Sequence, residues 1–253
     1  MNEIIPSMLT AFVTALATKG AEAPAQTFNN AWEYVFGPLD NFLIKQNSKR
    51  IQNKNKYLES IKENTEKIPT ENLQEPKLSI LGPALESSKY YIDETIIRNM
   101  FAKVIAGTFD NRKNNKIHHA YVDIIKQLGS LDAKLFSKIS SPFFLVAIES
   151  KILSKENTVD LLQNIYLDNE YTEVDISCAI AMSNLNRLGL INITNNIFTV
   201  KINSDYKPII DKLKETTYYK EKVKLLGEKN IKIYSQPCNI TELGFNFREI
   251  CLE

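Results

Sequence analysis

The sequence of 253 residues has few of the residue types that metal sites and disulfide frameworks use. It contains three cysteines and two histidines, and neither a C-x-x-C nor an H-E-x-x-H pattern occurs. An odd number of scattered cysteines argues against a disulfide framework or a zinc cluster and fits a reducing compartment. We therefore expect partly buried free thiols at Cys178, Cys238 and Cys251, and no metal ion.

The two histidines, His118 and His119, are adjacent in the sequence. Neighbours on a helix point about 100° apart, so one metal ion cannot easily reach both side chains. A histidine near a helix start more often caps or packs, and we favour that interpretation. The alternative is a hydrolase that uses His119 for proton transfer.

Glycine is also scarce, because the eight glycines are scattered along the chain. No G-x-x-x-x-G-K-[ST] or G-x-G-x-x-G loop is present to hold a phosphate, and no G-x-S-x-G elbow is present to expose a nucleophile. The sequence therefore predicts no catalytic residues, no cofactor and no enzymatic activity.

Neither sign of charge is in excess, since Lys+Arg number 31 and Asp+Glu number 30. This balance argues against a generally basic nucleic-acid binder. The apolar residues 4–18 are uncharged but fall short of the roughly 20 that span a bilayer. A signal peptide would require a basic side chain before the apolar run, and none precedes residue 4. We expect a cytoplasmic protein, with peripheral membrane contact left open.

Residues 1–44 are apolar and rich in aromatic side chains. Three of these are spaced four apart and line one helical face, and Gly37 and Pro38 are expected to interrupt the helix. Such a stripe is typical of packing in a core or against a partner, and membrane contact is the alternative. The candidate contact residues are Phe12, Phe28, Trp32, Phe36 and Phe42.

Residues 45–67 carry seven basic and three acidic side chains and few apolar ones, which predicts a charged helix. A solvated face is the simplest interpretation, and binding to anionic lipid or nucleic acid is the alternative. The candidate basic surface consists of Lys45, Lys49, Arg50, Lys54 and Lys56. Residues 68–77 hold two prolines and are predicted to be a linker that separates the region 1–67 from the rest.

Residues 78–140 are predicted to form a helical domain. Pro83 suits the first turn of a helix, and the apolar residues between 96 and 105 follow a helical period. Residues 110–117 are polar and predict a loop. A helix over 118–128 and another over 131–139 follow, with Gly129 between them.

Residues 141–253 are predicted to form a winged-helix-like domain with a small antiparallel sheet. We expect helices over 143–152, from Thr158, and from the cap Thr172 to Leu188. Residues 190–194 and 197–200 alternate and predict a hairpin. A lysine-rich helix over 206–229, a short strand near residue 231 and a terminal helix after Thr241 complete the domain. Few basic residues lie on the expected DNA-reading helix, so protein contact is favoured over DNA binding.

Two segments resemble one known family. The first reads HHAYVDIIKQLGSLDA over 118–133 and follows Arg98-x-x-Phe101-Ala102. The second reads LNRLGLI over 185–191, followed by Ile240-Thr241-x-x-Gly244-x-x-Phe247. Together they resemble the Abi-alpha (abortive infection alpha) family over roughly residues 75–253. The resemblance implies a bacterial protein connected with defence against phage, and it implies no reaction, cofactor or catalytic residue.

The sequence thus predicts a mainly α protein with a multi-helical body and a winged-helix-like C-terminal domain. The function expected is non-enzymatic phage defence through protein or membrane contacts. The alternatives are a nucleic-acid-binding winged-helix regulator and a membrane-active toxin. A protein partner or self-association is expected, a membrane surface is a further candidate, nucleic acid is less favoured, and a small-molecule ligand is left open.

Overall fold

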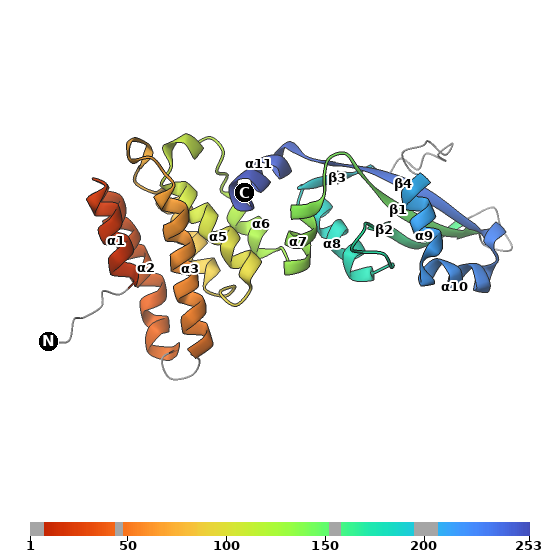
Figure 1. Cartoon of the computed structure of the whole chain (residues 1–253), viewed down its shortest axis with the longest axis horizontal. Helices are drawn as coiled ribbons and strands as arrows, with labels where there is room; N and C mark the ends of the chain where they lie inside the picture. The colour runs from red at the N-terminus through yellow and green to blue at the C-terminus, as the bar shows by residue number, and fades with distance from the viewer. Residues whose placement is uncertain (1–7, 44–47, 152–157, 195–206) are drawn as a thin grey trace. The chain divides into compact units, whose positions relative to one another are not determined.

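A computed structural model describes residues 8–43, 48–151, 158–194 and 207–253 (Figure 1). The chain divides into two compact units. The first contains residues 1–130 together with 246–253, and the second contains residues 131–245. Residues 68–77 lie in the first unit and include a short 3₁₀ helix, Thr70–Asn72. The boundaries expected from the sequence, at 68–77 and after 140, stay predictions.

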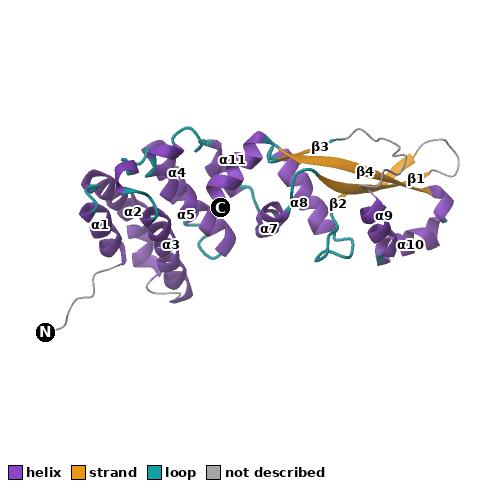
Figure 2. Ribbon diagram, turned by 45° about the horizontal axis from the view of Figure 1, so that its top comes forward, coloured by secondary structure: helices purple, strands orange, loops and turns teal. Residues whose placement is uncertain are grey.

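The described chain is mainly α with one small antiparallel sheet, as the sequence predicts (Figure 2). The helices of the first unit are α1 (Met8–Thr18), α2 (Glu22–Leu43), α3 (Ser48–Glu66), α4 (Leu78–Ser88), α5 (Thr95–Thr108) and α6 (Ala120–Lys126). A 3₁₀ helix, Asn111–Lys113, lies in the segment that the sequence predicts to be a polar loop.

Helix α2 supplies an aromatic face to the core of the first unit. The side chains of Phe28, Trp32 and Phe36 are all buried. The Phe28 ring meets Phe12 of α1 edge to face, with centroids 4.9 Å apart, and the Trp32 ring stacks on Phe36 at 4.3 Å. Tyr57 of α3 lies 5.9 Å from Trp32. Aromatic pairs of this kind add about 0.5–1.5 kcal/mol each beyond the apolar area they bury.

Two helices continue through a proline, which corrects the sequence prediction. Helix α2 runs through Pro38 to Leu43, where an interruption was expected, and Pro83 is the sixth residue of α4 and lies outside its first turn. In both helices the preceding residue is glycine, Gly37 or Gly82. Glycine has no Cβ to clash with the proline ring, so the α conformation before proline costs less there.

The second unit is built on a four-stranded sheet. Its strands are β1 (Phe143–Lys151), β2 (Thr158–Ile165), β3 (Ile191–Ile193) and β4 (Ile231–Ile240), and their order in the sheet is β2-β1-β4-β3. Each neighbouring pair is antiparallel. The helices are α7 (Ser130–Lys138), α8 (Ile176–Arg187), α9 (Lys207–Glu215), α10 (Thr217–Leu226) and α11 (Glu242–Cys251), the last of which ends among the residues of the first unit.

The helices predicted over 143–152 and from Thr158 are wrong, because these segments are strands β1 and β2. The β1 segment reads as a short apolar run, and a buried strand cannot be told from a buried helix by periodicity alone. In the β2 segment, apolar residues recur every three positions at Val159, Leu162 and Ile165, as on a helical face. The β1 segment is rich in phenylalanine, valine and isoleucine, which favour strands. It lies at the centre of the sheet and is buried over most of its length.

The winged-helix detail is not confirmed by the described residues. Strand β3 pairs with β4, and the expected second arm of the hairpin, 197–200, lies outside the described residues. Helix α8 is capped by Asp175, whose carboxylate accepts from the Ser177 N–H at 2.8 Å, so the predicted cap Thr172 lies outside the helix. The predicted helix over 206–229 is divided in two by Thr216, which caps α10.

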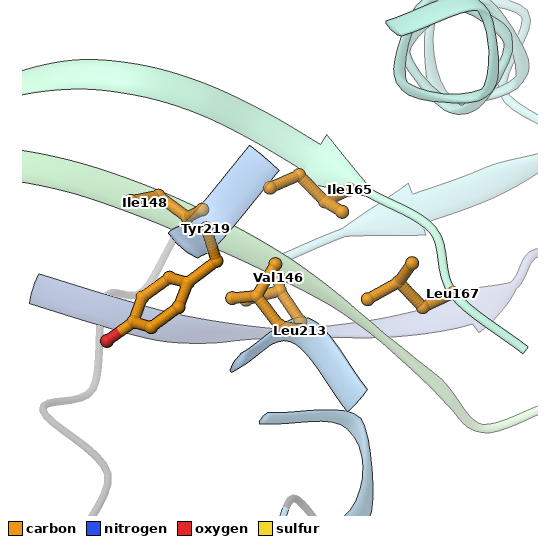
Figure 3. Close-up of a cluster of buried hydrophobic side chains, with 6 residues drawn as sticks. All are labelled: Val146, Ile148, Ile165, Leu167, Leu213 and Tyr219. Carbon is orange, nitrogen blue, oxygen red and sulfur yellow. The ribbon is translucent and has the colours of Figure 1, made fainter. Parts of the chain in front are cut away.

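One face of the sheet packs against α9 and α10. Leu213 of α9 and Tyr219 of α10 close over Val146 and Ile148 of β1 (Figure 3). Ile165 at the end of β2 completes this apolar layer together with Leu167. The spacing of the apolar positions in α9 and α10 gives each helix the one apolar face that this sheet needs.

Candidate functional site

The aromatic residues proposed for contact lie inside the first unit. Phe12, Phe28, Trp32 and Phe36 are buried and pack against one another. In this conformation they offer no surface to a lipid or a partner, and core packing accounts for the stripe. The side chain of Phe42 is outside the described part of the chain. No helix among the described residues is long and apolar enough to cross a bilayer.

The basic residues proposed for a surface are dispersed around α3. Lys49 and Lys56 are exposed and Lys54 is half-buried, while Lys45 is outside the described residues. Arg50 is partly buried, donates to the carbonyl oxygen of Lys89 at 3.1 Å and lies 3.9 Å from the Asp93 carboxylate. The structure thus uses one of the five to join α3 to the segment after α4.

Both histidines are exposed at the start of α6. The Nδ1 atom of His118 accepts a hydrogen bond from the backbone N–H of Ala120 at 3.1 Å. His118 thus bonds to the first N–H of α6, while the N-cap residue is His119, whose side chain makes no capping bond. Within the described ranges, no three His, Cys, Asp or Glu side chains are grouped so that they could hold a metal ion.

An apolar groove with a volume of about 1050 Å³ lies between α2 and α4. Helix α2 lines it with a stripe three or four residues apart, and α4 lines it in the same way. The lining residues are Thr27, Asn30, Ala31, Tyr34, Val35 and Pro38 of α2, Leu78, Gly82, Pro83 and Glu86 of α4, and Lys89 directly after α4. Each stripe covers 12 residues, and its first and last Cα atoms lie about 17 Å apart at a helical rise of ~1.5 Å per residue.

The walls of this α2–α4 groove carry unusually exposed apolar side chains. Tyr34 is 83% exposed and Leu78 is 62% exposed. Large apolar side chains gathered at one concave surface mark interaction sites more often than isolated ones do. Small residues, Ala31 and Gly82, line the same groove between them and leave room for an incoming side chain.

This groove was not predicted from the sequence, although the position of Tyr34 indicates a second surface on α2. Tyr34 lies two residues from Trp32 and from Phe36, which places it about 200° around the helix from either of them. An aromatic side chain opposite a buried aromatic face must lie on a second surface. Leu78 gave no comparable signal, because its position beside α2 depends on the tertiary structure.

A second concavity of the first unit is small and polar, and Asp110 is its buried carboxylate. Both of its oxygens accept from the Arg112 guanidinium, at 2.8 and 2.7 Å, and one also accepts from the Arg112 backbone N–H at 3.0 Å. These bonds to Arg112 hold the pKa of Asp110 below its usual value. The carboxylate is therefore charged near neutral pH.

We predict that Asp110→Asn lowers the free energy of unfolding by about 1–2 kcal/mol at neutral pH, because a buried charge-assisted hydrogen bond is lost. A depressed pKa in the folded state stabilises above the unfolded value of about 3.9, and this contribution is lost as pH falls through the folded pKa. The difference between wild type and variant should therefore narrow below about pH 4. Urea unfolding of both proteins across this pH range measures the stability difference. A difference that does not change with pH would contradict the lowered pKa of Asp110.

The fold and its surfaces define a mainly α protein with a small antiparallel sheet and an open apolar groove. The model of the family described as Abortive infection alpha matches residues 46–251. The chain belongs to this family, and the match extends the resemblance to include α3. Neither a curated protein nor a solved structure matches the chain.

Proposed function

We propose that this chain is a phage-defence factor that acts by binding a protein partner and catalyses no reaction. The family, whose description is abortive infection, supports the defence role. The observation that carries the mechanism is the α2–α4 groove with the exposed side chains of Tyr34 and Leu78. Buried aromatic or aliphatic anchors supply most of the affinity at protein interfaces.

The occupant that this groove fits best is an amphipathic helix of the partner, about three turns long. Two helical stripes about 17 Å long form its sides, and helices recognise such grooves through apolar residues at helical spacing. Polar side chains line it together with the apolar ones, including Asn30 and the paired Glu86 and Lys89. A mixture of apolar and polar side chains is the usual composition of a protein interface.

A lipid surface is a less suitable occupant of the groove. Membrane-binding faces are rich in lysine and arginine, which face anionic headgroups. The charged side chains of the groove are one glutamate and one lysine, Glu86 and Lys89, and they bond to each other. The groove is therefore neutral, and it is concave where a planar bilayer needs a protruding face.

The test introduces a charge into the groove and measures phage plating on cells that express each variant. We expect Tyr34→Glu and Leu78→Glu each to weaken partner binding about 10- to 30-fold and to abolish protection, since each places a carboxylate in an apolar contact. Leu225→Glu is the matched control, because Leu225 is 75% exposed on α10 of the other unit. It should protect like the wild type, and circular dichroism checks that all three variants fold.

Two further measurements separate this occupant from the others. A photo-crosslinking residue at position 34 in infected cells should give crosslinked peptides from a helix of another protein. Crosslinks to this chain itself, with a dimer that Tyr34→Glu dissociates, would replace the partner by a second copy. If the purified protein floats with vesicles and the Tyr34→Glu variant does not, the occupant of the groove is lipid and not a protein partner. Full protection by both groove variants would refute the assignment of the groove.

A further inference from the structure

The polar concavity around Asp110 has an excess of positive side chains. It has a volume of about 160 Å³ and lies entirely within the first unit, between the end of α3, α5, the 3₁₀ helix Asn111–Lys113 and the last residues of the chain. Its cations are Lys67, Lys103, Arg112 and Lys113, and its carboxylates are Asp110 and Glu253. Four positive groups thus face two negative ones.

In the described structure, Asp110 makes no hydrogen bond to the three lysines, and both of its oxygens accept from the Arg112 guanidinium. Among the residues that the structure describes, none of the ammonium groups of Lys67, Lys103 and Lys113 forms an ion pair with a carboxylate. The Lys103 ammonium donates to the carbonyl oxygen of Leu252, and that of Lys67 lies 3.4 Å from the amide oxygen of Asn64. Neutral acceptors thus hold the ammonium groups of Lys67 and Lys103.

The position of Lys103 shows the effect of this excess. Its side chain is partly buried at the middle of α5, and burial lowers its pKa. The positive charges of Lys67 and Lys113 lower this pKa further, while the nearby Cys251 and Glu253 raise it. Cations that repel one another in a partly buried site are stabilised by an anion that enters between them.

We propose that this lysine pocket, formed by Lys67, Lys103 and Lys113, binds a phosphate group in its doubly negative form. A phosphate offers several oxygens in a tetrahedral arrangement, so three ammonium groups on different segments can each reach one of them. A carboxylate offers only two oxygens in one plane and carries half the charge. Lysine commonly serves as a compact point charge for phosphate.

The volume of the pocket limits the ligand to this group. Sites for whole small molecules usually measure about 300–1,000 Å³, and this one is smaller. The phosphate therefore enters the pocket while the rest of the molecule stays outside. A soluble phosphomonoester and the headgroup of phosphatidic acid share this chemistry. The inference does not rest on the α2–α4 groove, because the two sites have no lining residue in common.

The test uses the full chain and titrates sodium phosphate against sodium chloride at equal ionic strength near pH 8. Calorimetry should detect phosphate binding, and the melting temperature should rise with phosphate because ligand binds the folded state. Lys103→Met and Lys113→Met should each weaken binding about tenfold or more. Lys113 lies outside the α-helices, so its variant remains informative if the α5 variant folds poorly.

Lys56→Met is the matched control, since Lys56 is exposed on α3 and does not line the pocket. It should bind phosphate like the wild type, as should Tyr34→Glu. A nucleoside 5′-monophosphate and vesicles with and without phosphatidic acid then distinguish the two sources of the group. Phosphate that binds no better than chloride, or equal binding by the Lys103 and Lys113 variants, would overturn the proposal.

Discussion

Replacing Phe28 by alanine is expected to lower the free energy of unfolding of the first unit by about 3–5 kcal/mol. The Phe28 side chain is fully buried and meets three other rings, those of Phe12, Trp32 and Phe109, at centroid distances of 4.9, 5.7 and 5.9 Å. It joins α1, α2 and the residue after α5. Alanine would leave a cavity at this junction, and a close-packed core relaxes only partly around such a cavity.

The chain provides its own probe and control for this prediction. Trp32 is the one tryptophan and lies next to Phe28, so its fluorescence reports unfolding of this core in urea. Tyr34→Ala is the matched variant, because Tyr34 is an aromatic residue of the same helix with an exposed ring. The free energy of unfolding of this variant should stay within about 0.5 kcal/mol of the wild-type value. Similar midpoints for both variants would mean that the aromatic face is not the core.

The aromatic stripe of α2 shows both the strength and the limit of a sequence pattern. Its spacing correctly predicts that Phe28, Trp32 and Phe36 share one helical face. The pattern cannot say what covers that face, because protein and lipid interiors are both apolar. The face is covered by Tyr57 and Phe109, which come from segments more than 20 residues away in the sequence. Their position beside α2 depends on the tertiary fold.

The strands of the second unit show a different limit. Strand β4 and helix α11 were predicted, because alternation and a capping residue are local signals. Strands β1 and β2 were mistaken for helices, because β1 is buried on both faces and therefore does not alternate. Their pairing with each other and with β4 decides the conformation, and pairing partners up to 95 residues apart, such as Phe143 and Cys238, leave no mark in a local window.

Neither candidate site could be found from the sequence alone. The α2–α4 groove brings together two helices, and only Tyr34 carried a local sign of it. The lysine pocket joins positions as distant as Lys67 and Glu253. A count of charges over the whole chain gives a balance near zero and hides a local excess. The local excess is what a ligand meets, because exposed charges more than about 10 Å apart are largely screened from one another at moderate salt. Only the tertiary structure shows that lysines distant in the sequence lie close together.

Replacing Gly244 by alanine is expected to destabilise the second unit by about 3 kcal/mol, near the upper end of typical overpacking. A Cβ at this position would lie deep inside the van der Waals radius of the Leu190 carbonyl oxygen and 2.9 Å from the Ile240 side chain. A backbone carbonyl cannot rotate away as a side chain can. Helix α11 or residue 190 must therefore move.

That movement would break the bonds that anchor the start of α11. The backbone N–H of Thr241 donates to the Leu190 carbonyl at 3.1 Å, and the Thr241 hydroxyl accepts from the N–H of Gly244 at 2.9 Å. Hydrogen exchange should show faster exchange of these amides in Gly244→Ala, with a lower melting temperature by circular dichroism. Phe245→Ala is the control, because Phe245 is 47% exposed in the same turn and its replacement by alanine introduces no new atom. An unchanged melting temperature in Gly244→Ala would show that α11 does not approach Leu190 so closely. The glycine of the second family-like segment would then need another physical reason.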